Sequence, residues 1–178
     1  MRQAVNWQPD FEALVEEHQS MVFSIALRMT GDRGLAEELA QDVLLELDRN
    51  LHKLSSAEHA RFWLRQVAMH RSADALRRRK VKAPTLGFDV WDELEERHGL
   101  LVSEGDSSLS IRIEEMLASL PEAHRSVIIL RYQEDLTPDE IAATLKAPVA
   151  TVKSHLQRGL KLLRVKASQT LKEYVRGS

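Results

Sequence analysis

The chain has 178 residues, of which 43% are hydrophobic, enough to bury the core of one ordinary domain or of two very small ones. It has no cysteine, which excludes disulfide bonds and thiolate metal sites and fits a reducing compartment. The net charge is −2, and neither a signal peptide nor a membrane-spanning run is evident, so we expect a cytoplasmic protein without membrane insertion.

The charge is distributed unevenly along the chain. Residues 1–60 carry 5 basic and 11 acidic side chains, whereas residues 61–82 carry 8 and 1. Residues 83–108 carry 1 and 7, residues 109–145 carry 3 and 7, and residues 146–178 carry 8 and 1. Two basic segments are thus separated by an acidic middle, which favours binding to a polyanion at two places. Solvent-exposed helix faces produce similar charge runs, so the charge distribution alone does not establish a polyanion-binding function.

Residues 1–82 predict a three-helix bundle, because apolar side chains recur there at helical spacing. Asp10 is placed to cap the first helix. The third helix ends in the basic run Arg77–Lys80. Its inner stripe is expected to comprise Leu64, Val67, Ala68, Arg71 and Ala75. The helices are predicted over about 11–29, 35–51 and 60–80, joined by a turn at Thr30-Gly31-Asp32 and a polar loop at Ser55–His59.

The periodicity disappears between the two basic segments. Residues 83–108 contain seven carboxylates, three glycines and a proline, which predicts a flexible acidic linker with one helical turn near residues 91–97. Periodicity returns at Leu109, and residues 109–178 are expected to form a second small domain. Pro121 separates its first helix from another at Val127–Tyr132.

The end of the chain predicts a helix-turn-helix. Its first helix opens with the capping box Thr137-Pro138-Asp139-Glu140 and ends near Leu145. Lys146 occupies a turn position where many such motifs have glycine, at a cost of roughly 1 kcal/mol for a left-handed backbone. The second helix has an aliphatic inner face, so a solvated amphipathic hairpin is the alternative. Its outward side chains suit bases and phosphates of a major groove: Lys153, Ser154, His155, Gln157, Arg158 and Lys161.

No constellation of residues predicts catalysis. The seven histidines are scattered without a convincing ligand spacing, and no glycine-rich phosphate loop is present. Glu37 and Glu38 form a pair on a helix face. We therefore expect a protein that is not an enzyme and that carries no metal or cofactor.

Four strings of the C-terminal half are informative together: Leu120–Arg125, Leu130–Tyr132, Thr137–Ala142 and Thr151–Ser154. They resemble region 4 of the sigma-70 family, and most closely its extracytoplasmic-function (ECF) group. The resemblance implies binding to the −35 promoter element and to the β flap of RNA polymerase. The family often has arginine at the position of His155. By position, the DNA contacts are Arg131 on the backbone, with Lys153, Ser154, His155, Gln157, Arg158 and Lys161 on the recognition helix.

The string Thr151–His155 also resembles the output domain of LuxR-type regulators. The N-terminal half of the chain distinguishes a sigma factor from such a regulator. Its strings Phe11–Leu14, Met29–Asp32, Ala36–Val43 and Phe62–Leu64, with the basic end Asp74–Arg79, resemble sigma region 2. The family docks its second helix on the β′ coiled coil of the polymerase. By position, that surface is Glu38, Gln41, Asp42 and Leu45 here.

The third helix of region 2 and the loop before it read the −10 element in the family. Phe62 or Trp63 is a candidate to stack on a flipped base. The alternative is that the ring belongs to the hydrophobic core, and this alternative is favoured for Trp63. His70 replaces a usual asparagine, and Asp48 stands where an aromatic residue is common. The matching DNA-reading positions are Ser55, Ser56, Glu58, His59 and Arg61 in the loop, with His70, Arg71, Arg77 and Arg78 in the helix.

The sequence thus predicts an all-α fold of two small helical domains, a three-helix region 2 and a helix-turn-helix region 4, joined by a flexible acidic linker. The resemblance implies an ECF sigma factor that binds core RNA polymerase and promoter DNA and is held by an anti-sigma factor. A stand-alone LuxR-like regulator and a helical adaptor that binds only protein are the alternative functions.

Overall fold

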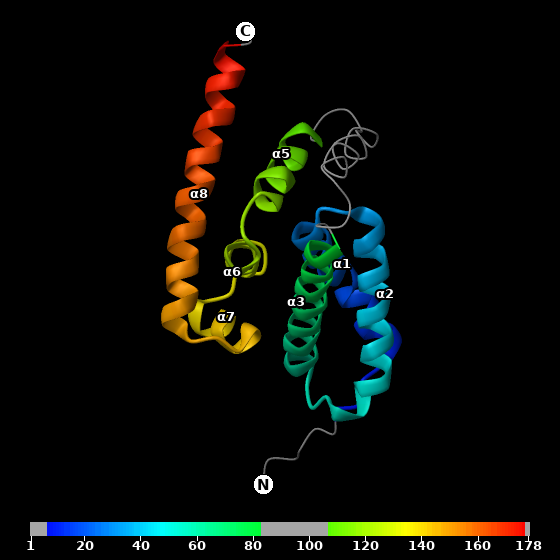
Figure 1. The fold of residues 1–178 in the computed structure, drawn as a ribbon. Coiled ribbons are helices and arrows are strands. Elements are labelled where there is room, and N and C mark those ends of the chain that lie inside the picture. The colour runs from blue at the N-terminus through cyan, green and yellow to red at the C-terminus, as the bar shows by residue number, and fades with distance from the viewer. Residues whose placement is uncertain (1–6, 83–106, 177–178) are drawn as a thin grey trace.

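The computed structural model describes residues 7–82 and 107–176, and all of its regular structure in these ranges is helical. Two groups of helices pack side by side in Figure 1, with α1, α2 and α3 in one group and α5 to α8 in the other. The predicted all-α fold is confirmed. The predicted turn at residues 91–97 and most of the predicted linker lie outside the described residues.

The first two helices begin and end where their local sequence directs. α1 spans Phe11–Thr30 and α2 spans Arg33–Asn50. Asp10 caps α1 by accepting from the backbone N–H of Glu12, as predicted. Gly31 then adopts a left-handed conformation with φ 66°, and its N–H donates to the carbonyl of Leu27. Asp32 caps α2 by accepting from Leu35, so the chain reverses within two residues.

α3 begins earlier than the sequence predicts. After the short 3₁₀ helix η1 (Leu51–Lys53), α3 spans Ala57–Lys82, whereas the prediction started at Ala60. The hydroxyl of Ser56 accepts from the backbone N–H of His59 at 3.0 Å and so caps the helix three residues ahead of the expected start. The expected polar loop is therefore shorter, because its second half is the first turn of α3.

The buried face of α3 is also different from the predicted stripe. Met69, Ser72 and Ala73 are buried, whereas Arg71 and Ala75 are only partly covered. α3 packs against α1 and α2 on one side and against α6 and α7 on the other. A helix between two neighbours buries a wider face than the single stripe that the prediction assumed.

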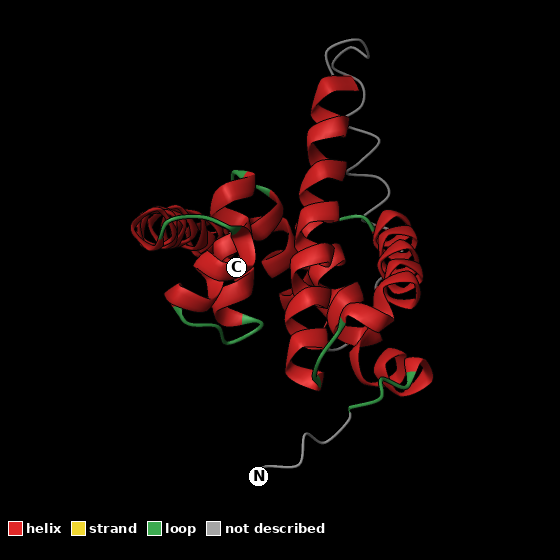
Figure 2. Ribbon diagram, turned by 90° about the horizontal axis from the view of Figure 1, so that it is seen from below, coloured by secondary structure: helices red, strands yellow, loops and turns green. Residues whose placement is uncertain are grey.

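The C-terminal group contains four helices: α5 (Ser107–Ala118), α6 (Glu122–Tyr132), α7 (Pro138–Leu145) and α8 (Val149–Arg176). α5 begins two residues before the expected start of the domain. α6 begins five residues before the predicted Val127, directly after Pro121, and is buried over most of its length. α8 is the long helix at the left edge of Figure 1, and in Figure 2 the same helix is seen nearly end-on.

The helix-turn-helix geometry matches its prediction closely. Thr137 accepts from the N–H of Glu140, and the Glu140 carboxylate accepts from the N–H of Thr137, so the capping box is complete. Lys146 ends α7 in the left-handed conformation, with φ 52° and ψ 46°. Val152 and Ile141 are fully buried between α7 and α8. None of the described helices is long and apolar enough to cross a membrane.

The strained turn gives a test of the fold. We expect Lys146→Gly to stabilise the free protein by about 1 kcal/mol, because glycine adopts this backbone without a Cβ clash. Thermal unfolding should show a rise of a few degrees in Tm. As the matched control, Ala143→Gly in the exposed middle of α7 should lower Tm by a similar amount. A lower Tm for Lys146→Gly would contradict the argument.

Candidate nucleic-acid interface

The N-terminal turns of α8 carry a cationic face that is open to solvent. Lys153, Gln157, Arg158 and Lys161 are exposed, while Val152 points into the core. Among the described residues, none of these cations forms an ion pair. Unpaired cations on the second helix of a helix-turn-helix are suited to bind phosphates and guanine edges. The structure thus brings together most of the predicted −35 residues.

Two other residues of the predicted −35 set, His155 and Arg131, have protein partners. Ser154 and His155 are half-buried, and the His155 ring bonds to His124 of α6. Arg131 donates to the carbonyl of Leu136 at 3.0 Å and so holds the turn between α6 and α7. That turn includes Asp135 in a left-handed conformation. A DNA contact by Arg131 remains a prediction.

A second exposed face lies on α2 and mixes polar and apolar groups. Glu38, Gln41, Asp42 and Leu45 are all exposed and lie three or four residues apart, so they form one stripe along the helix. Leu45 is 57% exposed, so its aliphatic side chain is accessible at the surface. An exposed aliphatic side chain flanked by carboxylates is typical of a protein-binding surface.

The predicted −10 cations divide into paired and unpaired groups. Arg71 donates from Nε to Glu46 at 2.8 Å, and its guanidinium lies 3.8 Å from Asp42. Arg71 therefore ties α3 to α2. Arg61, His70 and Arg78 are exposed, and neither arginine has an ion-pair partner within the described part of the chain.

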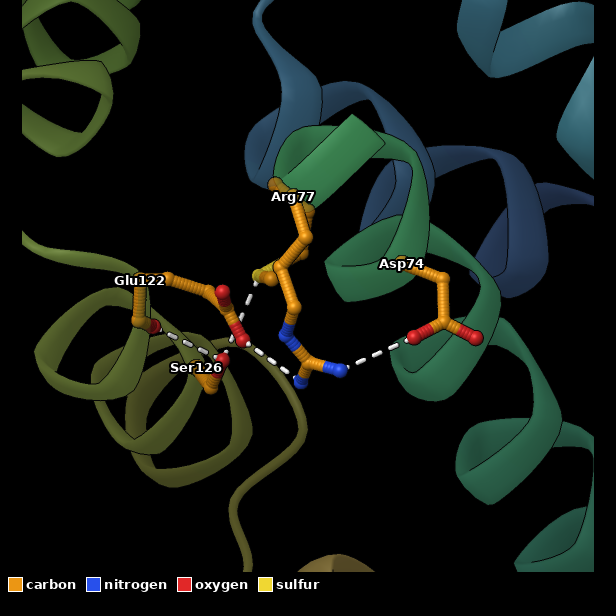
Figure 3. Close-up of polar contacts among 5 residues, drawn as sticks. Asp74, Arg77, Glu122 and Ser126 are labelled. Carbon is orange, nitrogen blue, oxygen red and sulfur yellow. Dashed lines mark hydrogen bonds and ion pairs between the residues drawn. The ribbon is translucent and has the colours of Figure 1, made fainter. Parts of the chain in front are cut away.

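Arg77 joins α3 to the C-terminal group of helices. Figure 3 shows its guanidinium between Asp74 of its own helix, at 2.9 Å, and Glu122 of α6, at 3.1 Å. The hydrogen bond to Glu122 is the main reason that the pKa of Arg77 is raised. Ser126, one turn along α6, donates to the carbonyl of Glu122. One predicted −10 residue is thus engaged inside the protein.

The residues before α3 hold the start of the helix. Ser55 bonds to the Nδ1 of His59 through its hydroxyl at 3.1 Å, and Ser56 is the helix cap described above. Glu58 is exposed in the first turn. Trp63 is half-buried against the main core, as favoured by the sequence, whereas Phe62 is 37% exposed. Phe62 is therefore the more accessible aromatic ring for stacking on a base.

A polar interface between the two groups of helices was not predicted from the sequence. The ion pair Arg65–Glu134 joins α3 to the turn after α6 at 2.9 Å, with side chains only 11% and 6% exposed. Gln66 donates to the carbonyl of Thr144 in α7. The guanidinium of Arg125 is buried and donates to the carbonyls of Met29, Ala118 and Leu120. The partners that join the two groups of helices are 69 to 96 residues apart in the sequence. A local sequence pattern therefore cannot predict these contacts.

An apolar groove of about 410 Å³ runs between α5, α6 and α8. Ile113 and Tyr132 at its edge are 40% and 61% exposed. Among the described residues, no cluster of three or more histidine, aspartate or glutamate side chains is arranged to hold a metal ion.

Comparison with known proteins matches both halves to one family. The sigma-70 region 2 model matches residues 14–81, and the sigma-70 region 4 model matches residues 110–163. The ECF RNA polymerase sigma factor SigW of Bacillus subtilis is 27% identical over 166 residues, which is 88% of each chain. SigX of the same organism is 26% identical over 158 residues, covering 86% of this chain and 81% of SigX.

Solved structures show the same fold. The sigma factor RpoE of Bartonella quintana, in complex with the anti-sigma factor NepR, has a TM-score of 0.66 at 18% identity. That match covers 87% of this chain and 94% of RpoE. CnrH, in complex with the cytosolic domain of CnrY, has a TM-score of 0.65 at 19% identity and covers 93% and 92%.

The interface between the helix groups gives a prediction. Arg65→Ala leaves the buried Glu134 carboxylate without its ion-pair partner and with only the side-chain amide of Gln133 as a donor, which costs about 3–5 kcal/mol. We expect the docked arrangement to open, seen as a larger radius of gyration in solution scattering and faster amide exchange in α7. The exposed pair Arg33–Glu37 supplies the control, since Arg33→Ala should cost only about 0.2–1 kcal/mol.

The double variant Arg65→Met with Glu134→Leu removes both charges and should restore compactness, because an apolar pair replaces a buried ion pair at little cost. An unchanged radius for Arg65→Ala would show that this ion pair does not hold the halves together.

Proposed function

The chain belongs to the sigma-70 family of transcription initiation factors, in its ECF group, and we propose how its two halves divide promoter recognition. α8 of region 4 binds the −35 element, α3 of region 2 reads the −10 element, and α2 docks on core RNA polymerase. The observation that carries the proposal is the unpaired cationic face of α8 in a chain whose other half matches region 2.

The geometry of α8 supports the −35 contact. Val152 and Ile141 fix the helix against α7, so Lys153, Gln157 and Arg158 project from a rigid scaffold. Lysine and arginine bind phosphates and guanine acceptors, and glutamine pairs with adenine. A stand-alone LuxR-like regulator would use only this half, and it would leave the region 2 match of residues 14–81 unexplained.

The α2 stripe supports the contact with the polymerase β′ coiled coil. Leu45 supplies an exposed apolar anchor, and Glu38 and Asp42 flank it with negative charge. The β flap contact belongs to region 4 by the family resemblance. The groove edged by Ile113 and Tyr132 is an apolar surface of region 4 that suits such a contact.

Reading the −10 element requires the two halves to separate at α3. Arg77 is bonded to Glu122 of α6, so its guanidinium becomes available to a phosphate only when that contact breaks. Arg61 and Arg78 are already exposed. We propose that the described arrangement is the free form of the protein and that docking on polymerase accompanies its opening.

An anti-sigma factor is the proposed regulator. RpoE and CnrH, which share this fold, are each described in complex with such a partner. The family resemblance leads us to place the protein in the cytoplasm, where it acts without catalysing a reaction. Run-off transcription with core enzyme and genomic fragments tests the function as a whole: defined start sites should appear only when the protein is added.

The −35 assignment predicts a specific loss of DNA binding. Lys153→Ala with Arg158→Ala should weaken binding to a −35 duplex at least about tenfold and lower the salt slope by about 2, because two cation–phosphate or cation–base contacts disappear. Fluorescence anisotropy over a salt series measures both quantities. Core polymerase binding should not change.

Lys172→Ala is the matched control for this variant. It removes one positive charge from an exposed site on the same helix, about 28 Å farther along the axis than Lys153. Its affinity should stay within about twofold of the wild type. Loss of core binding by the double variant would contradict the proposed division between the two halves.

The α2 assignment predicts the reverse pattern. Leu45→Asp should weaken core polymerase binding by about tenfold or more, since it places a charge where an apolar anchor is expected. Binding to the isolated −35 duplex should be unchanged. Glu37→Ala, exposed on the same helix outside the stripe, is the control for a general effect on α2. Equal core binding by both variants would remove the support for this surface.

A further inference from the structure

Two histidine rings meet where the recognition helix crosses α6. The Nδ1 atoms of His124 and His155 are 3.0 Å apart, the ring centroids are 4.9 Å apart and the ring planes are inclined by 47°. A distance of 3.0 Å is that of a hydrogen bond, and one Nδ1 must then carry a proton while the other accepts it. The contact joins α6, which is largely buried, to a half-buried residue of the predicted recognition helix α8.

The close approach of the helices is built into the sequence at Gly159. A Cβ atom at this position would lie 2.9 Å from Cδ1 of Ile128 and 3.3 Å from Cβ of His124. Glycine therefore lets α8 lie against α6 at the level of the histidine pair. A larger residue would require the Ile128 side chain to shift and would press on His124, one helical turn from His155.

The outer nitrogens of both rings remain available. Within the described residues, neither Nε2 makes a hydrogen bond and neither is a buried atom without a partner, so both reach solvent. The Nε2 atom lies across the ring from the bonded Nδ1. His155 thus presents a polar atom outward from a helix whose neighbours Lys153, Gln157 and Arg158 are exposed.

We propose that His124 is a positioning residue for promoter recognition: it holds His155 through the Nδ1–Nδ1 hydrogen bond so that the outward Nε2–H donates to DNA, and protonation of His155 strengthens that contact. The inference rests on the proposed −35 contact of α8. It concerns a residue of α6 that touches no DNA itself and acts only through its neighbour.

The proton arrangement follows from what DNA offers. Phosphate oxygens and the N7 and O6 atoms of guanine are acceptors, so they select the forms of His155 that carry a proton on Nε2. One is the neutral ring that accepts from His124 at Nδ1. The other is the imidazolium, which donates from both nitrogens and needs His124 as a neutral acceptor. A single added proton therefore keeps the ring–ring bond and makes it charge-assisted.

The surroundings of His124 disfavour its protonated form. Burial lowers the pKa of His124, and the nearby charges of His155 and Arg158 lower it further. Those two residues lie on α8; on α6, Arg125 is turned to the carbonyls of Met29, Ala118 and Leu120, and Glu122 pairs with Arg77. No described charge of α7 contributes to the shift. A positive charge on His124 is thus disfavoured, which suits His124 as the neutral acceptor in the pair.

This arrangement predicts the direction in which the affinity for DNA changes with pH. Histidine is the side chain whose charge changes in the range of pH 5 to 8, so acidification favours a cationic donor to DNA over a neutral one. Hydrogen bonds from charged donors exceed those from neutral donors by an amount that corresponds to about fivefold in affinity. Full conversion to the cationic donor should therefore tighten binding to a −35 duplex about fivefold.

The test measures the affinity of the full-length protein for a −35 duplex at pH 8, 7 and 6 at constant ionic strength. His124→Phe keeps a ring of similar volume but removes the acceptor, so it should weaken binding and flatten the pH profile. His155→Gln should flatten it as well. His155→Arg carries a permanent charge, so its binding should be tight, independent of pH and insensitive to a second change at His124.

Lys153→Ala is the control that separates this inference from the proposed function. It should weaken binding at every pH and keep the fivefold profile. If Lys153→Ala and Arg158→Ala have no effect, the −35 assignment itself fails. If they weaken binding but His124→Phe keeps the wild-type profile, only the histidine inference is overturned.

Two further readings complete the test. Nitrogen-15 shifts of His155 should show a proton on Nε2 in the DNA complex at both ends of the pH range, and an unprotonated Nε2 would overturn the proposal. Loss of the pH profile on adding EDTA would also overturn it, because the two rings would then share a metal ion. An unchanged profile with EDTA supports the proton-linked contact.

Discussion

The buried guanidinium of Arg125 joins the two groups of helices, and the positions of the exposed faces depend on it. It donates to the carbonyls of Met29 at the end of α1 and of Ala118 and Leu120 in the turn before α6. The last carbonyls of a helix lack helical partners and carry partial negative charge, so a cation is well placed there. Burial lowers the pKa of Arg125, while the Glu122 carboxylate opposes this shift. This one side chain thus joins the end of α1 in one group of helices to the end of α5 in the other.

The same docking determines which cations are accessible. With α6 held against α1, α3 lies between the two cores, and Arg77 is drawn into its contact with Glu122. Arg79 is likewise held by Asp32, the cap of α2, at 2.7 Å. α8 lies on the far side of α6 from α3, as Figure 1 shows, and keeps Lys153 unpaired. The described arrangement therefore exposes the cations of α8, while Arg77 and Arg79 of α3 are paired internally.

Local rules account for what the sequence predicted well, and distance along the chain accounts for what it did not. The capping box Thr137–Glu140 and the left-handed Lys146 depend on neighbours within a few residues, so both could be predicted. Glu134 could not be predicted, because its partner lies 69 positions away on another element. The role of His124 is hidden for the same reason, since its contact spans 31 positions. Ser72 is buried because α3 packs on two sides, which periodicity alone does not reveal.

The interface between the two groups of helices combines polar and apolar contacts. One continuous cluster of buried apolar residues includes Val22 of α1 and Ile141 of α7, so the cores of the two groups meet. Ionic and amide contacts such as Arg65–Glu134 accompany them, and the cost of removing such charges from water offsets most of their attraction. Water solvates those charges again when the groups separate, whereas it does not compensate for exposed apolar surface. Residues 83–106 join the halves, and a chain of that length reaches about 80 Å when extended. The opening that we propose would therefore cost little for the charged groups and more for the apolar surface that it exposes.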